Sequence, residues 1–196
     1  AFNSQDNDGQ PIAIHKYASK ASIIKECEDS LQRLGTDYID LYQIHWNDIT
    51  TPIEESFEAV AQLIKEGKVR YAGVCNYDVA MLKRAQSVCE IVSNQIPYSM
   101  VNRGIEQDIL PYCIEENIAV LAYSPLQRGL LTGKMKAGYT FEAGDHRATN
   151  SYFQDDVILA TNDLLKQLKP IAEKYNATLG QIVLHWTIMQ QGITVA

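Results

Sequence analysis

A histidine and a tryptophan, His45 and Trp46, directly follow an apolar, β-forming run at positions 38–44. In parallel α/β proteins the carboxyl ends of strands carry the chemistry, so a reactive side chain is expected there. A neutral imidazole at such a position can donate a hydrogen bond to a carbonyl oxygen and polarise it. The alternative for His45 is a core histidine satisfied by a backbone group, and for Trp46 a core aromatic residue.

The elements that would position these side chains alternate between strand and helix. Periodicity predicts strands at 38–45, 69–75, 91–95, 118–123 and 193–195. Helices are predicted at 22–34, 52–66, 78–89, 105–116, 157–175 and 178–190. Residues 1–20, with a turn at Asp8-Gly9, and residues 127–155 are expected to be loops. This alternation indicates a mostly parallel sheet.

Helix boundaries are marked by residues that satisfy free backbone groups. The expected N-terminal caps are Ser22 and Asp78, together with capping boxes at Thr51–Glu54 and Thr178–Gln181. Gly35 is expected to end the first helix, and Pro170 to kink or break the fifth.

Composition limits the classes of function. The 196 residues are 46% hydrophobic and carry a net charge of −7, which gives nucleic-acid binding no electrostatic support. No apolar run approaches the roughly 20 residues that span a bilayer. Four cysteines in apolar settings predict free thiols in a reducing, cytoplasmic compartment. Both ends of the sequence look cut rather than natural.

From pattern alone, five strands fit an open doubly wound sheet nearly as well as part of a barrel. No Gly-x-Gly-x-x-Gly follows any predicted strand, which weakens the dinucleotide fold that uses this motif. The histidines other than His45 have no metal-ligand spacing with one another, with cysteines or with carboxylates, so no metal site is predicted.

Four segments, in order, resemble the aldo-keto reductases. They are Tyr38–Trp46 (YIDLYQIHW), Gly73–Tyr77 (GVCNY), Asn94-Gln95, and Ala122–Lys134 (AYSPLQRGLLTGK). The last is also similar to potassium-channel β-subunits. The resemblance implies a (β/α)8 TIM barrel present only in part, about strands four to eight, with residues 1–196 as a single partial domain.

The resemblance assigns roles to the strand-end residues. His45 is implied to orient and polarise an aldehyde or ketone, with Trp46 as a wall of the substrate pocket. Asn76 and Gln95 are implied to hold the nicotinamide carboxamide, which needs both a donor and an acceptor. Cys75 stands where the family has serine, and a thiol is a poorer donor than a hydroxyl.

The fourth segment is implied to bind the rest of the cofactor. Tyr123 would stack on the nicotinamide, and the residues after it would wrap the pyrophosphate: Ser124, Pro125, Leu126, Gln127, Arg128 and Gly129. Lys134, and either Arg128 or Arg147, would add positive charge; solvated loop charge is the alternative. The run Gly129–Lys134 is not a P-loop, because its spacing is one residue short and no serine or threonine follows the lysine.

The resemblance therefore predicts an NAD(P)H-dependent oxidoreductase, with NADPH preferred, that reduces small aldehydes or ketones. Of the family's Asp, Tyr, Lys and His tetrad, only the histidine has a counterpart in this chain, and the other three would precede Ala1. A second prediction is a nicotinamide-binding sensor or accessory subunit with little catalysis. A third is an α/β interaction domain without a ligand. The sequence does not indicate the substrate or the oligomeric state.

Overall fold

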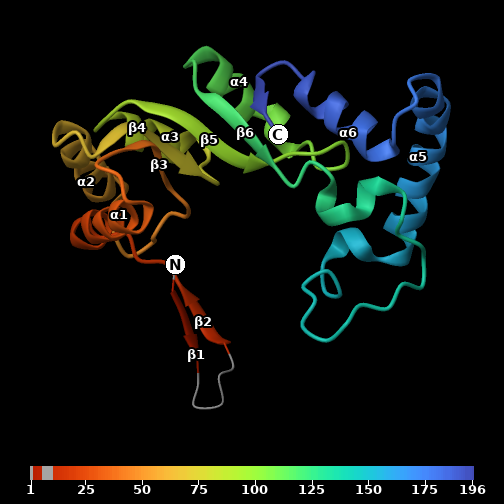
Figure 1. Cartoon of the computed structure of the whole chain (residues 1–196), viewed down its shortest axis with the longest axis horizontal. Coiled ribbons are helices and arrows are strands. Elements are labelled where there is room, and N and C mark those ends of the chain that lie inside the picture. The colour runs from red at the N-terminus through yellow and green to blue at the C-terminus, as the bar shows by residue number, and fades with distance from the viewer. Residues whose placement is uncertain (1, 6–10) are drawn as a thin grey trace. The chain divides into compact units, whose positions relative to one another are not determined.

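A computed structural model describes residues 2–5 and 11–196, with side chains from Lys16 onward. The chain forms two compact units: the first unit is residues 1–96 with 108–120, and the second unit is residues 97–107 with 121–196. The elements labelled in Figure 1 include β1 (Phe2–Gln5), β2 (Pro11–His15), α1 (Lys20–Leu34), β3 (Ile39–Ile44), α2 (Ile53–Lys65), β4 (Val69–Cys75), α3 (Val79–Gln86) and β5 (Ile91–Pro97). The chain continues with η1 (Gly104–Gln107), α4 (Ile109–Glu115), β6 (Ala119–Tyr123), η2 (Gln127–Thr132), η3 (Ser151–Phe153), α5 (Asp155–Lys174), α6 (Leu179–Ile188) and β7 (Ile193–Val195).

The five predicted strands form one sheet in the order β3-β4-β5-β6-β7, which confirms the mostly parallel arrangement. In the first unit, β3 pairs in parallel with β4, with Gln43 opposite Gly73. Strand β4 pairs in parallel with β5, with Cys75 opposite Gln95. This register brings the carboxyl ends of three strands to one edge of the first unit.

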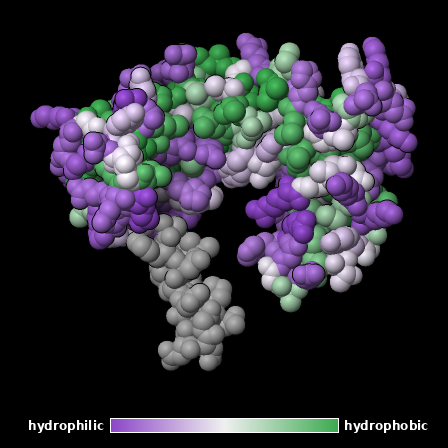
Figure 2. Space-filling model, viewed as in Figure 1, coloured by the Kyte–Doolittle hydropathy of each residue, from purple (hydrophilic) through white to green (hydrophobic). Residues whose placement is uncertain are grey.

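In the first unit, α2 packs against strand β4 and against helices α1 and α3. Its apolar stripe is fully buried at Phe57, Val60 and Leu63, because hydrophobic residues recur at helical spacing. Figure 2 shows that mostly hydrophilic residues cover the visible surface of α1 and α2. These helices therefore have one face in the core and one in solvent.

The second unit is built on two apolar clusters. One cluster joins η2 to helices α5 and α6 through Leu131, Leu165 and Val183. The other is formed by Leu130, Met135, Phe153 and Ile158, under the long loop. The loop predicted at 127–155 thus contains η2 and η3 and is anchored by buried side chains.

Several cap predictions are confirmed. Gly35 ends α1 at φ 65°, and Asp78 caps α3 by accepting from the Met81 amide. Thr178 and Gln181 form a reciprocal capping box at the start of α6. These signals are local in sequence, so their geometry follows from a few adjacent residues.

Two other caps were predicted wrongly. Helix α1 begins at Lys20 and is capped by Ser19, whose side chain accepts from the Ser22 amide. Thr51 does not cap α2, because its hydroxyl donates to Asp48 Oδ2 at 2.7 Å. In both cases a neighbouring side chain provides a partner that helix periodicity alone does not reveal.

Three boundaries also differ from the predictions. Residues 1–20 contain the antiparallel strands β1 and β2 rather than only a loop, and Asp8-Gly9 lies outside the described residues. The helix predicted at 105–116 is divided into η1 and α4, because Asp108 leaves helical geometry and accepts from the Ile109 amide. Helix α5 runs through Pro170 without a break. Pro170 and Lys166 are both exposed, so water can bind the carbonyl that the proline leaves unpaired.

Candidate functional site

His45 is the first residue after β3, at the strand end where the sequence predicted it, and its side chain is exposed. The rings of His45 and Trp46 lie 5.8 Å apart between centroids, and Lys16 Nζ lies 4.1 Å from the Trp46 ring centroid. A small pocket of about 100 Å³ opens here between β3 and the segment before α1. His45 can therefore reach a small molecule from the protein surface, as a buried core histidine could not.

Asn76 closes the adjacent strand end. It has a left-handed backbone with φ 61°, which asparagine tolerates better than most residues. Its Nδ2 donates to the His45 carbonyl oxygen at 3.3 Å, and its backbone amide donates to the Gln95 carbonyl oxygen at 2.9 Å. Asn76 thus ties together the ends of β3, β4 and β5.

A hydrogen-bonded cluster of side chains lies on the same face as His45. Gln43 Nε2 donates to Gln95 Oε1 at 2.7 Å and lies 3.7 Å from Cys75 Sγ. Cys75 Sγ lies 3.6 Å from the same Gln95 oxygen, and Ser93 Oγ donates to Gln43 Oε1 at 3.1 Å. The structure therefore brings predicted residues Cys75 and Gln95 together and adds Gln43 and Ser93 to them.

Gln43 and Ser93 were not predicted as site residues. The period of two along β3 was the available signal, because it places Gln43 on the same face as His45. Gly73 makes room for the cluster: a Cβ there would collide with Ser93 Oγ and lie 3.0 Å from Gln43 Cγ. Glycine is thus required at this position for close packing.

Asn94 belongs to the other face of β5. It is fully buried and donates from Nδ2 to the Tyr77 carbonyl oxygen at 2.9 Å. This bond holds the turn that follows Asn76, so the structure gives Asn94 a supporting role beside the predicted site residue Gln95.

The second unit contains the predicted cofactor loop. Tyr123 ends β6, and its carbonyl oxygen accepts from the Tyr98 amide at 3.2 Å. After it, Ser124, Gln127 and Arg128 all have positive φ, between 46° and 56°. The Gln127 amide donates to the Ser124 carbonyl oxygen at 2.8 Å, which folds the loop into a tight turn. Left-handed turns of this kind can direct backbone N–H groups toward an anion.

Side chains in this loop are divided between core and solvent. Gln127 is buried, and its Oε1 accepts from Ser99 Oγ at 3.1 Å, so this side chain holds the loop in place. Leu126 packs against the cluster of Leu131, Leu165 and Val183. That Ser124, Pro125, Leu126, Gln127, Arg128 and Gly129 bind a cofactor stays a prediction.

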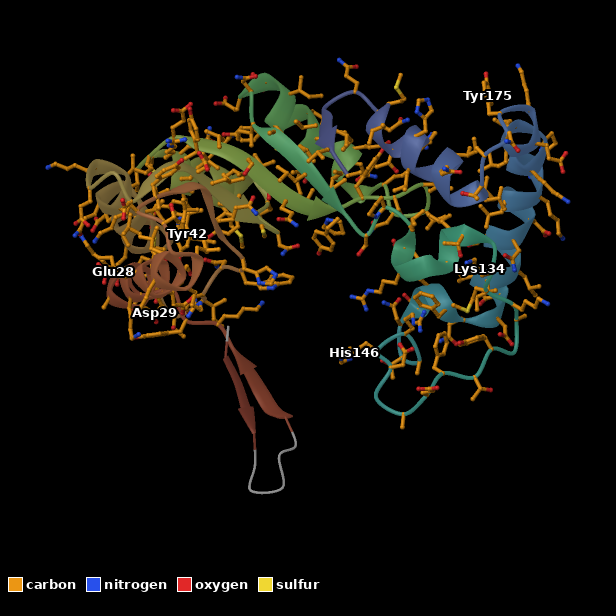
Figure 3. All side chains as sticks on the ribbon, in the orientation of Figure 1. Glu28, Asp29, Tyr42, Lys134, His146 and Tyr175 are labelled. Atoms are coloured by element: carbon orange, nitrogen blue, oxygen red, sulfur yellow. The ribbon has the colours of Figure 1, made fainter. Side chains whose placement is uncertain are left out.

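The predicted basic residues differ in their surroundings. Arg128 and Lys134 are exposed, and Figure 3 shows Lys134 just after η2 and His146 in the loop beyond. Arg147 pairs with Asp145 through three contacts of 2.6–3.1 Å. The hydrogen bonds from Arg147 lower the pKa of Asp145 to about 2. The charge of Arg147 is therefore already compensated, which leaves Arg128 and Lys134 as the better candidates for binding an anion.

Among residues 2–5 and 11–196, no group of three or more His, Cys, Asp or Glu side chains could hold a metal ion. No described helix is long and apolar enough to cross a membrane.

A parallel sheet with helices, and polar side chains at the carboxyl ends of its strands, defines an α/β protein. The chain belongs to the aldo/keto reductase family, whose sequence model matches residues 10–196. The prediction of a (β/α)8 barrel present in part is thereby confirmed.

Individual relatives agree with this assignment. The NADH-specific methylglyoxal reductase of Escherichia coli (strain K12) is 36% identical over 183 residues, which are 92% of this chain and 56% of that protein. A glycerol dehydrogenase from Gluconobacter oxydans has a TM-score of 0.89 at 36% identity, over 93% of this chain and 56% of its own. An aldo/keto reductase from Klebsiella pneumoniae, in complex with NADP and acetate, has a TM-score of 0.67 at 30% identity, over 91% and 54%. The chain thus spans about half the length of these relatives.

Proposed function

We propose that the protein is an NAD(P)H-dependent oxidoreductase that reduces small aldehydes or ketones to alcohols. The observation that carries the proposal is the edge of the first unit where β3, β4 and β5 end. There an exposed imidazole, His45, lies beside Asn76, which is tied by hydrogen bonds to both His45 and Gln95. Family membership supports carbonyl reduction as the general chemistry.

The chemistry of these side chains fits a nicotinamide group. A carboxamide presents one acceptor and two donors, and the amides of Asn76 and Gln95 offer the complementary groups on adjacent strands. When bound, a reduced nicotinamide would supply a hydride, which carries two electrons, to the carbonyl carbon of the substrate, and the oxygen would take one proton, to complete the alcohol, from a general acid that the family resemblance places outside residues 1–196. The part of these side chains is to fix the cofactor ring relative to His45.

His45 supplies the group that acts on the substrate. A neutral imidazole donates a hydrogen bond to the carbonyl oxygen, which draws electron density from the carbon and stabilises negative charge on the oxygen. Trp46, whose side chain is 38% exposed, offers an aromatic wall beside it. Both residues project from the turn after β3, so they act from a fixed strand end.

The loop after β6 is proposed to hold the phosphates. Ser124 contributes a hydroxyl and the tight turn contributes backbone amides, with Arg128 and Lys134 as exposed cations. Tyr123 is proposed to stack on the nicotinamide. We propose NADP as the preferred cofactor. The relative rates with NADPH and NADH test this preference, since one relative is NADH-specific and a related structure contains NADP.

The test is oxidation of NADPH and of NADH by the full-length protein with a panel of small aldehydes and ketones. His45→Ala should lower kcat by on the order of 10²–10³, because it removes a donor aimed at the developing charge. It should leave nucleotide affinity nearly unchanged. His146→Ala, which changes an exposed histidine in the long loop, is the matched control and should keep full activity.

Two other outcomes would contradict the proposal in different ways. Tight nucleotide binding with no carbonyl reduced would support a sensor or accessory subunit instead. No binding of either nucleotide would support an interaction domain without a ligand.

A further inference from the structure

Gln43 lies at the centre of the polar cluster, and although it belongs to the first segment that resembles the family, the resemblance assigns it no contact with cofactor or substrate. It precedes His45 by two residues on β3 and faces the same side of the sheet. Its side chain lies over Gly73 on β4 and reaches Gln95, which is two strands away. Gln43 is therefore placed to act on Gln95 rather than on the substrate.

The hydrogen bonds of the Gln43 side chain determine which end of its amide faces Gln95. The Ser93 hydroxyl donates to Gln43 Oε1 at 3.1 Å, so the other end of the Gln43 amide, Nε2, faces Gln95. Nε2 then donates to Gln95 Oε1 at 2.7 Å, and the thiol of Cys75 lies 3.6 Å from the same oxygen. With its oxygen engaged in this way, Gln95 has its Nε2 donors to offer a ligand.

Close packing keeps this arrangement in place. A side chain at position 73 would displace both Ser93 and Gln43. Ser93 is buried, which limits the freedom of its hydroxyl. Without such contacts, a glutamine side-chain amide can rotate with little loss of free energy, which exchanges the positions of its oxygen and nitrogen. The contacts of Gln43 with Ser93 and Gln95 remove that freedom.

We propose that Gln43 is a positioning residue that fixes the Gln95 amide with Nε2 toward the cofactor, so that Gln95 donates to the carbonyl oxygen of the nicotinamide carboxamide. The inference rests on the proposed function. It goes further by stating which end of Gln95 meets the cofactor and which side chain determines this. Substitution of Gln43 is therefore expected to change the binding free energy of the nicotinamide group and not that of the rest of the nucleotide.

The test is the dissociation constant of NADP and NAD for the full-length protein and its variants, measured beside ADP-ribose with and without a 2′-phosphate. These fragments lack the nicotinamide. Gln43→Leu should weaken nucleotide binding roughly three- to ten-fold, the effect of one hydrogen bond, and change fragment binding less than about two-fold. Gln62→Leu, an amide-to-leucine change on the surface of α2, should change neither.

Gln43→Glu is a second variant that keeps polar contacts in the cluster. A carboxylate can only accept, so it attracts Gln95 Nε2 and turns the Gln95 oxygen toward the cofactor. Nucleotide affinity should fall at least as far as in Gln43→Leu. The 3-acetylpyridine analogue of the nucleotide keeps the carbonyl oxygen and lacks the amide nitrogen. It should bind the parent protein and lose affinity in Gln43→Glu.

A double-mutant cycle separates positioning from a general structural effect. In a Gln95→Ala background, Gln43→Leu should cause no further loss of nucleotide affinity, because its only route is through Gln95. An equal loss in both backgrounds, or nucleotide binding unchanged by both Gln43 variants, would overturn the inference while the proposed function stands. If the parent protein binds the ADP-ribose fragments but gains nothing from the nicotinamide, the proposed function itself is overturned.

Discussion

Cys75 stands where the family resemblance leads one to expect a serine. The side chain is buried, 6% exposed, and burial raises the pKa of its thiol, so the group is a neutral, weak donor at physiological pH. Its nearest polar atoms are Gln95 Oε1 at 3.6 Å and Gln43 Nε2 at 3.7 Å. The thiol thus fills the space of a hydrogen-bonding residue while bonding weakly.

Cys75→Ser should therefore tighten nicotinamide nucleotide binding. A hydroxyl donates more strongly than a thiol, and a gain of about 0.5–1.5 kcal/mol corresponds to roughly two- to twelve-fold in affinity. Titration of the full-length protein with NADP and NAD measures the change, with Cys113→Ser, another buried cysteine, as the control. Equal or weaker binding by Cys75→Ser would show that the thiol is not a substitute for the family's hydroxyl.

The positions of the candidate site residues were predictable where a segment resembled a known family, and their roles stay predictions. His45 and Asn76 directly follow β3 and β4, and Gln95 lies near the end of β5. For Gln43, the period of two along β3 indicated only the face that it shares with His45, because its contact with Gln95 joins residues 52 positions apart in the chain. The side-chain register that brings them together becomes visible only when the sheet is formed.

Among the elements, the turn after β3 is held by one carboxylate. Asp48 Oδ2 accepts from the Ala18 amide at 2.9 Å and from the Thr51 hydroxyl at 2.7 Å. Its Oδ1 accepts from the Thr50 amide at 2.8 Å and hydroxyl at 2.6 Å. Burial raises the pKa of Asp48, but these four hydrogen bonds outweigh it and bring the pKa to about 2. Asp48 thereby fixes the turn that carries His45.

Asp48→Asn should destabilise this turn, because an amide nitrogen cannot accept the bonds that one carboxylate oxygen receives. We expect a loss of about 1.5–3 kcal/mol in the free energy of unfolding at neutral pH. Urea unfolding measures it, and the exposed Asp37→Asn is the matched control, expected within about 0.5 kcal/mol of the parent. A parent-like stability for Asp48→Asn would contradict this role.

The pH dependence of stability follows from the same carboxylate. Because the folded pKa of Asp48 is depressed below its value of 3.8 in the unfolded chain, its contribution is complete above about pH 4 and is lost as the pH falls toward 2. The difference in stability between the parent and Asp48→Asn should therefore shrink below pH 4. A difference that stays constant to pH 2 would assign the effect to packing rather than charge.

Helix boundaries show why element prediction worked only in part. The caps at Asp78 and Thr178 depend on neighbours three residues away and were predicted correctly. Thr51 also had the sequence of a cap, but Asp48 takes its hydroxyl. Competition between partners is decided by geometry, which short-range patterns do not contain.

At the scale of the whole molecule, strand β6 is shared by the two units. Ala119 and Val120 belong to the first unit, and residues 121–123 to the second. A strand forms by hydrogen bonding to its neighbours in a sheet, so the two parts of β6 are expected to form together. Residues 1–196 are accordingly proposed to unfold as one cooperative domain.

The two tryptophans allow a direct test, because Trp46 lies in the first unit and Trp186 in the second. In Trp46→Phe and Trp186→Phe variants, the remaining tryptophan reports the unfolding of one unit only. Leu63→Ala in the first unit and Leu165→Ala in the second each remove a buried side chain and should cost about 2–5 kcal/mol. If the domain is cooperative, either truncation shifts the urea midpoint reported by Trp46 and the midpoint reported by Trp186 by the same amount. Leu34→Ala is the control, because this residue is 67% exposed, and it should shift neither midpoint appreciably. A shift confined to the tryptophan of the truncated unit would show that the units unfold separately.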